Sequence, residues 1–286
     1  MIIKGLIPAF CSGETLRTQI EDRIARSRED SFDIWWLGQS GFLVQWNKQC
    51  LLFDPYLSDS LTKKYSGTEK PHARMGELVI QPYLLDKINI VTSSHNHTDH
   101  LDAETLQPLL KANPNLKFLI PEANRSFVCE RVGCSFDFPL GLNDGDNLKI
   151  GPFEFFGVPA AHNTIERDDK GRCKFMGFVV KFGKWTIYHS GDTLLYDGMA
   201  ATLAPFQVDV AFLPINGNDP SRGVAGNLNC SEAAGLGKAI DARLVIPHHY
   251  HMFEFNTAEP ADFAKAADAI QQPYKILRLG ETMSIS

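Results

Sequence analysis

The sequence predicts an α/β (α+β) protein in which two β-sheets pack face to face and the helices cover the outside. Two observations support this fold. A run of short strands is followed by alternating strands and helices, and this order occurs twice in the 286 residues. Most strands are apolar along their whole length, so both of their faces need cover. The composition does not shift along the chain, and we expect one domain spanning residues 1–286.

The first half opens with a helix and then changes to strands. Leu16, Ile20 and Ile24 lie four residues apart, which predicts an amphipathic helix over residues 12–29. The segments "DIWWLG", "FLVQW" and "CLLFD" are separated by turn residues and predict an antiparallel meander. Residues 56–87 have little periodicity and predict a long loop with short helices, and loops of this length are often functional.

The rest of the chain alternates strands and helices. The strand "INIVTSS" is followed by a helix over 102–112, the strand "KFLI" and a helix near 122–132. Four strands then predict a second meander: "NLKI", "FEFFGV", "FMGFVVKF" and "KWTIYHS". Helices over 194–203, 231–240 and 258–270 lead to further strands, which are "VDVAFLPI", "ARLVIP", "YKILRLG" and "TMSIS".

Composition and charge narrow the class of protein. The net charge is −6 and no basic stripe is present, which argues against a nucleic-acid partner. The six cysteines form no CxxC pair and are typical of reduced thiols. No apolar run approaches the roughly 20 residues of a membrane span, and the start "MIIKGLIPAFCSGE" is too short in its apolar part for a signal peptide. We therefore expect a cytoplasmic protein without a membrane partner.

The segment "SSHNHTDHLD", residues 93–102, follows directly on an apolar strand. It places His95, His97, Asp99 and His100 within six positions. His95 and His97 lie two apart, so on an extended segment their side chains point the same way. Imidazoles with one carboxylate suit Zn, Mn or Fe better than Ca or Mg. Two imidazoles on one side and an Asp-His pair on the other could serve two adjacent metals.

Other strand ends offer further metal ligands. Each is an apolar strand followed at once by histidine or aspartate, and such residues at one location favour a common site over separate turns. The candidates are Asp54 in "LLFDPY", His162 in "VPAAH", His189 and Asp192 in "YHSGDT", and His248, His249 and His251 in "LVIPHHYH".

The order of these motifs resembles the metallo-β-lactamase superfamily. "HNHTDH", "AAH", "SGDT" and "PHHY" match its pattern of HxHxDH, His, Asp and His. Within the superfamily, "WWLGQSG", "YHSGDT", "LPINGNDPSRG" and "VIPHHYHMFEFN" are similar to segments of the L-ascorbate-6-phosphate lactonase group. The resemblance implies the metallo-β-lactamase fold, a four-layer αββα sandwich with a dinuclear site at one edge of the sheets.

The resemblance also implies a role for each candidate. The ligands would be His95, His97 and His162 for the first metal, Asp99, His100 and His249 for the second, and Asp192 between them. Asp54 would orient a ligand. His248 remains an alternative to His249 as the last ligand. His189 is shared with the lactonase group and would act either behind the ligands or on the substrate.

The chemistry expected of such a site is hydrolysis. Two divalent transition-metal ions (Zn or Mn, with Fe also acceptable) lower the pKa of a bound water and supply hydroxide at neutral pH. Asp99 or Asp192 could hold that hydroxide, which would attack a carbonyl or phosphoryl centre. The chain has no G-x-S-x-G nucleophile motif and no G-x-G-x-x-G nucleotide motif.

The lactonase resemblance implies a small-molecule substrate, a sugar lactone that carries a phosphate in that group. Asn216 and Arg222 follow a strand at the same edge, and we expect Arg222 to contact an anionic group. A phosphodiesterase is the main alternative, and a catalytically silent metal-binding protein is another. An RNA nuclease is disfavoured by the charge, and an exported β-lactamase by the lack of a signal peptide. The resemblance implies a homo-oligomer.

Overall fold

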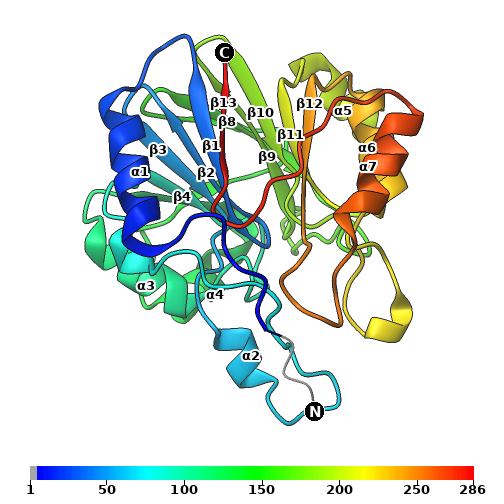
Figure 1. The fold of residues 1–286 in the computed structure, drawn as a ribbon, viewed down its shortest axis with the longest axis horizontal. Helices are drawn as coiled ribbons and strands as arrows, with labels where there is room; N and C mark the ends of the chain where they lie inside the picture. The colour runs from blue at the N-terminus through cyan, green and yellow to red at the C-terminus, as the bar shows by residue number, and fades with distance from the viewer. Residues whose placement is uncertain (1–4) are drawn as a thin grey trace.

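The computed structural model describes residues 5–286, whose strands form one sheet of seven strands and one of six (Figure 1). The sheets face each other and helices lie on both outer sides, which confirms the predicted αββα class. The N-terminal stretch that argues against a signal peptide includes residues 1–4, which lie outside the described residues. No helix within residues 5–286 has both the length and the apolar character needed to cross a bilayer.

The first sheet joins the opening meander to parallel strands. In sheet order its strands are β13 (Thr282–Ile285), β1 (Phe32–Gly38), β2 (Gly41–Trp46), β3 (Gln49–Phe53), β4 (Ile90–Thr92), β5 (Lys117–Pro121) and β6 (Leu140–Leu142). β1 to β3 are antiparallel as predicted, and β4, β5 and β6 extend the sheet in parallel. The short strand β6 was not predicted. The C-terminal strand β13 returns to pair with β1.

The second sheet repeats this arrangement. In sheet order its strands are β12 (Leu244–His248), β11 (Val210–Pro214), β10 (Trp185–His189), β9 (Met176–Phe182), β8 (Phe153–Pro159) and β7 (Asn147–Ile150). β7 to β10 form an antiparallel meander, and β10, β11 and β12 are parallel. Because β9 runs opposite to both its neighbours, β8, β10 and β12 all end at the same edge of the sheet.

Helices cover both outer faces (Figure 1). Those on the first sheet are α1 (Gly13–Ala25), α3 (Ala103–Ala112) and α4 (Arg125–Val132), and those on the second are α5 (Met199–Leu203), α6 (Cys230–Ala239) and α7 (Pro260–Ala269). The loop at 56–87 contains α2 (Ser60–Lys64) and the 3₁₀ turn η1 (Pro82–Leu84), as predicted. The other 3₁₀ turns are η2 (Glu122–Asn124), η3 (Ala204–Phe206) and η4 (Pro220–Arg222).

Aromatic side chains hold the two sheets together. Phe42 of β2 stacks on Phe212 of β11 with ring centroids 4.2 Å apart. Phe32 of β1 meets the edge of Phe182 of β9 at 5.2 Å. All four rings are buried, and burial of each contributes about 1.5–3 kcal/mol. This packing fixes the sheets against each other, so the loops at their edges keep a constant separation.

Two expected elements differ in the structure. The helix expected over 194–203 begins only at Met199, because Gly198 adopts a left-handed backbone (φ 85°) just before it. The strand expected from "YKILRLG" is absent among the described residues. Tyr274 makes a single bridge to Val245, and the backbone N–H of Gly280 then donates to Trp36 of the other sheet. The segment therefore crosses from the second sheet to the first and carries the chain to β13.

Candidate metal centre

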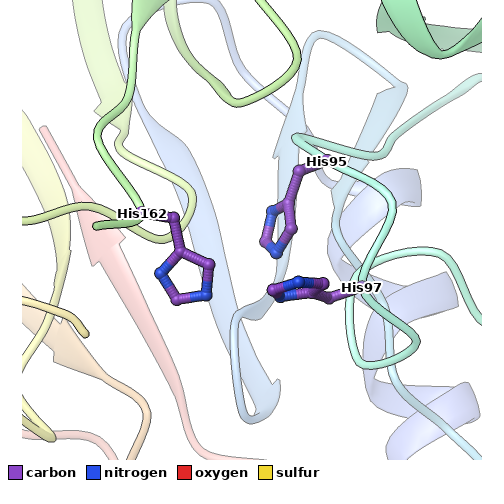
Figure 2. A group of neighbouring side chains, drawn as sticks. All are labelled: His95, His97 and His162. Carbon is purple, nitrogen blue, oxygen red and sulfur yellow. The ribbon is translucent and has the colours of Figure 1, made fainter. Parts of the chain in front are cut away.

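Three imidazoles meet where β4 and β8 end (Figure 2). His95 and His97 follow β4, and His162 follows β8. One ring nitrogen of each histidine lies within 4.8 Å of the corresponding nitrogens of the other two. The structure thus brings together the three histidines expected on the first metal, and they come from different sheets.

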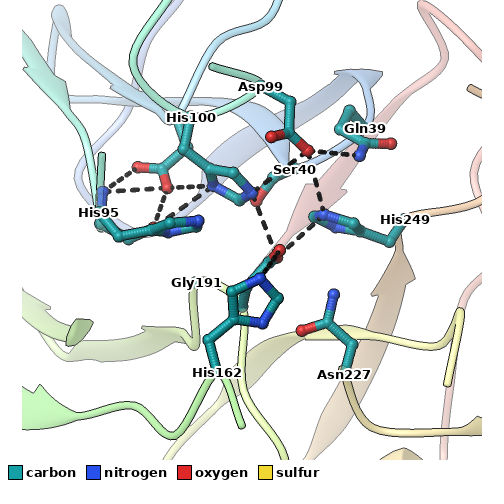
Figure 3. A network of polar contacts seen from close by, with 12 residues as sticks. Gln39, Ser40, His95, Asp99, His100, His162, Gly191, Asn227 and His249 are labelled. Atoms are coloured by element: carbon teal, nitrogen blue, oxygen red, sulfur yellow. Dashed lines mark hydrogen bonds and ion pairs between the residues drawn. The ribbon is translucent and has the colours of Figure 1, made fainter. Parts of the chain in front are cut away.

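A second group lies beside the first (Figure 3). Its donor atoms also lie within 4.8 Å of one another, and its members are Asp99, His100, Asp192 and His249. Asp192 stands between the groups: its Oδ1 lies 2.9 Å from Nε2 of His249, and its Oδ2 lies 3.5 Å from Nε2 of His162. This position suits the bridging role that the sequence predicts.

Buried nitrogens test whether a cation fits this site. Nε2 of His95, His100 and His249 is buried and makes no hydrogen bond within residues 5–286, although two of these rings contact Asp192. Buried polar atoms without a partner are uncommon in folded proteins, and each needs an explanation. Imidazole nitrogens with carboxylates are the donor set of transition metals. The residues present therefore fit divalent transition-metal ions.

In His100 and His162 the other ring nitrogen, Nδ1, already makes a hydrogen bond. Nδ1 of His100 donates to the carboxylate of Asp54 at 2.8 Å, and Nδ1 of His162 donates to the carbonyl of Gly226 at 2.8 Å. A neutral imidazole with its proton on Nδ1 keeps a lone pair on Nε2, which is the form that binds a metal. Both rings are therefore oriented as ligands.

Burial and neighbouring charges set different protonation states at the donors. Burial lowers the pKa of His100 and His249, but the carboxylate of Asp192 outweighs it and raises both pKa values, so a bound cation would replace a proton on these rings. Burial lowers the pKa of His95 well below its usual value, so this ring is neutral. Burial opposes ionisation of Asp192, but the adjacent His249 and His100 outweigh it and hold the pKa of this carboxyl well below its usual range. A neutral imidazole and an ionised carboxylate are the forms that coordinate a cation.

A cavity of about 370 Å³ opens over the two groups, a size typical of small-molecule sites. Its floor includes His97, Asp99, His162, Asp192 and His249. Its walls come from four parts of the chain: Lys64, Tyr65 and His72 of the loop at 56–87, Arg131 of α4, Asn227 before α6, and Phe253, Phe255 and Asn256 after β12. The unassigned loop at 56–87 thus forms one wall of the cavity.

Comparison with known proteins identifies the family. Residues 50–250 match the family model described as "Beta-lactamase superfamily domain". The chain belongs to the metallo-β-lactamase superfamily. A curated relative, the UPF0173 metal-dependent hydrolase of Caldivirga maquilingensis, is 26% identical over 253 residues, which cover 87% of this chain and 96% of that protein.

Solved structures share the superfamily fold. Igni18, a metallo hydrolase from Ignicoccus hospitalis, superposes with a TM-score of 0.65 at 21% identity over 90% of this chain and 99% of that chain. An isothiocyanate hydrolase from Delia radicum gut bacteria gives a TM-score of 0.70 at 18% identity over 88% of this chain and 98% of that chain. At these identities the likeness shows the fold alone.

In this superfamily member, Asp54 lies behind the metal groups at the end of β3. It is fully buried. Its Oδ2 accepts from Nδ1 of His100, and its Oδ1 accepts from the hydroxyl of Thr92 at 2.7 Å. The backbone N–H of Ser94 donates to it at 3.1 Å. Asp54 thus holds His100 and the start of the histidine turn, which suits the orienting role expected of it.

His248 and His249, at the end of β12, point in different directions. His249 adopts a left-handed backbone (φ 61°), which turns its ring toward Asp192. His248 is fully buried, does not line the cavity and lies with its Nδ1 2.8 Å from Nδ1 of His249. The geometry favours His249 as the ligand and leaves His248 behind it.

Of the two roles expected for His189, its position agrees with the one behind the ligands. It is fully buried, and the cavity does not reach it. Its Nδ1 accepts the backbone N–H of Gly191 at 3.2 Å, so the ring proton is on Nε2, which donates to the carbonyl of Ser40 at 2.9 Å. The expectation of a catalytic residue in contact with substrate is therefore corrected: His189 supports the turn that carries Asp192.

Asn216 and Arg222 also lie outside the cavity wall. Arg222 donates through Nη1 to the carbonyl of Asn216 and to the side chain of Asn256. These contacts turn Nη1 of Arg222 toward the protein. The expectation that Asn216 and Arg222 bind substrate directly is corrected by their position, because neither residue lines the cavity.

Sequence reasoning did not single out Gln39, although it lies in the quoted segment "WWLGQSG". Its side-chain Nε2 donates to Oδ2 of Asp99 at 2.8 Å, and its backbone carbonyl accepts the backbone N–H of His249 at 3.2 Å. Its left-handed backbone (φ 49°) at the turn after β1 allows both contacts. A polar residue at a strand end was the available signal, as it was for Asp54.

Proposed function

We propose that this chain hydrolyses a lactone, with two divalent transition-metal ions held by the two side-chain groups. By family it is a metal-dependent hydrolase, the description that its curated relatives carry. The observation that carries the proposal is the sharing of Asp192 by two groups of donors that open onto one cavity.

The grouping of the side chains supports the proposed ligands. The first ion would be held by His95, His97 and His162, the second by Asp99, His100 and His249, and both by Asp192. Bound ions of this kind acidify water and polarise an acceptor oxygen. Zn and Mn both suit this donor set, and Fe is also compatible.

The chain's own residues then orient the reactants. Asp99 and Asp192 line the cavity as carboxylates and can accept a hydrogen bond that holds the attacking water in place. Gln39 donates to Asp99 and would keep that carboxylate in place as a ligand. Asp54 keeps His100 in place from behind. Preorganised contacts of this kind lower the cost of reaching the transition state.

The cavity walls support a small, polar substrate. Lys64 and Arg131 line the cavity, and they provide positive charge for an anionic substituent such as a phosphate. Tyr65, Phe253 and Phe255 provide flat apolar surface for a ring. With the resemblance to the L-ascorbate-6-phosphate lactonase group, these walls favour a sugar lactone, phosphorylated or not.

The test combines metal analysis with two substrate classes. We expect about two transition-metal ions per chain and lactone turnover that a chelator abolishes and Zn or Mn restores. Turnover of a phosphodiester alone would keep the metal site and replace the lactonase by a phosphodiesterase. Protein that takes up no metal after reconstitution would refute the proposal.

A further inference from the structure

Four polar residues connect the surface loop of η4 to the cavity. Arg222 donates through Nη1 to Oδ1 of Asn256 at 3.1 Å. Nδ2 of Asn216 donates to the same oxygen at 2.9 Å. Nδ2 of Asn227 in turn donates to Oδ1 of Asn216 at 3.1 Å. The four side chains form a continuous series of hydrogen bonds that ends at a residue lining the cavity.

The orientation of every amide in this series follows from the arginine. A guanidinium has donors and no acceptor, so Asn256 must turn its oxygen toward Arg222. Asn216 must then present its NH₂ group to that oxygen and its own oxygen to Asn227. Asn227 must then donate its NH₂ group to the oxygen of Asn216. A flipped amide at any step would place two donors or two acceptors against each other.

The series therefore leaves the oxygen of Asn227 free. Asn227 is 1% exposed, and its Oδ1 is buried and accepts no hydrogen bond within residues 5–286. Figure 3 draws Asn227 next to His162 and His249, and all three line the cavity. The carbonyl of the preceding residue, Gly226, accepts from His162, which ties this turn to the metal groups.

We propose that Asn227 is a specificity-determining residue whose Oδ1 accepts a hydrogen bond from a substrate hydroxyl, and that Arg222 is the positioning residue that fixes this polarity through Asn256 and Asn216. This inference rests on the proposed function, because it concerns the same cavity. It narrows the substrate class to lactones with a hydroxyl near the reacting ester. A buried acceptor left without a donor penalises the analogue that lacks the hydroxyl.

The experiment compares γ-butyrolactone with its 2-hydroxy and 3-hydroxy derivatives on the metal-loaded protein. The readout is the ratio of kcat/KM for hydroxylated over unsubstituted lactone, which a general loss of folding or activity would not change. We expect the unaltered protein to prefer a hydroxylated lactone at least about tenfold. Asn227→Leu removes the acceptor and Arg222→Leu frees the amides to flip, so both should reduce the preference to about twofold or less.

Ser221→Ala is the matched control, since its exposed side chain lies in the same loop and takes no part in the series. It should keep the full preference. A preference that survives in Asn227→Leu would overturn the role of Asn227. A preference lost in Asn227→Leu but kept in Arg222→Leu would overturn the role of Arg222.

Failure of the lactonase proposal would be visible separately, as absence of turnover on every lactone. Calorimetry with D-gluconate and hexanoate then decides the inference. Gluconate should bind the unaltered metal-loaded protein at least about tenfold more tightly than hexanoate, and Asn227→Leu should remove most of that difference. Gluconate can also chelate the ions, but it does so equally in the unaltered protein and in Asn227→Leu. This contribution therefore cancels when the two affinity differences are compared. An equal difference in both proteins would refute the inference.

Discussion

Oδ1 of Asp192 lies 2.9 Å from Nε2 of His249, so the turn after β10 meets the end of β12 at a single carboxylate. The same carboxylate contacts His100 through Oδ1 at 3.2 Å and His162 through Oδ2 at 3.5 Å. Its three histidine contacts come from both sheets. Asp192 therefore contacts both of the proposed donor groups, through both of its carboxylate oxygens.

Replacement of this carboxylate tests its bridging role. Asp192→Ala should reduce bound metal from about two ions per chain to less than one and should abolish hydrolysis, because both groups lose a shared negative ligand. Elemental analysis after desalting measures the metal. Asp262→Ala, on the exposed surface of α7, is the control and should keep both ions. Two ions retained in Asp192→Ala would contradict the bridging role.

Substitution of Asp54 tests whether its contact with Nδ1 orients the ring of His100. Asp54→Asn should weaken metal affinity by about 10–100-fold, since the amide carries no charge and keeps only one acceptor oxygen for His100, Thr92 and Ser94 together. Thr92→Val removes only the hydroxyl that donates to Asp54 and should have a smaller effect. A metal titration with a competing chelator measures both. Unchanged affinity in Asp54→Asn would show that His100 does not depend on this contact.

Separate variants distinguish the two histidines at the end of β12. His249→Ala should lose the second ion, because its Nε2 faces Asp192. His248→Ala should keep both ions with reduced affinity, because the Nδ1 of His248 contacts the Nδ1 of His249, the ring nitrogen that does not face Asp192. Metal content and activity of the two variants, measured side by side, give the answer. The reverse result would make His248 the ligand.

Metal removal should lower thermal stability. The ions would bind donor atoms that converge only in the folded chain, so binding stabilises the native state. At 100 times the dissociation constant the gain is about 2.7 kcal/mol. For a chain of this size that corresponds to a rise in Tm of roughly 4–5 °C. Scanning calorimetry with chelator and with added Zn or Mn measures it, and Asp192→Ala should show little response. A Tm that does not change when bound metal is removed would contradict the prediction.

Much of the fold could be predicted from local patterns. The meanders, the parallel strand–helix units and the first helix, expected over 12–29 and found as α1 (Gly13–Ala25), follow from apolar periodicity, which short segments of sequence carry by themselves. The failures occur where longer-range contacts decide. The segment at 274–280 is as apolar as a strand, but it crosses between the sheets, with Tyr274 bridged to one and Gly280 bonded to the other.

The sequence by itself also determined the candidate ligands, because "HNHTDH" and the strand-end residues Asp54, His162, Asp192 and His249 are visible as polar side chains after buried strands. Only the tertiary structure decided which polar neighbours face the cavity. His248 and Arg222 have the right chemistry and the right location in the sequence, yet one points behind the site and the other is bound to Asn256. The physical reason is that the direction of a side chain depends on the local turn of the backbone and on partners far away in the chain. Asn227 acquires its free oxygen in the same way, from an arginine and two amides that reach it only when the loops fold together.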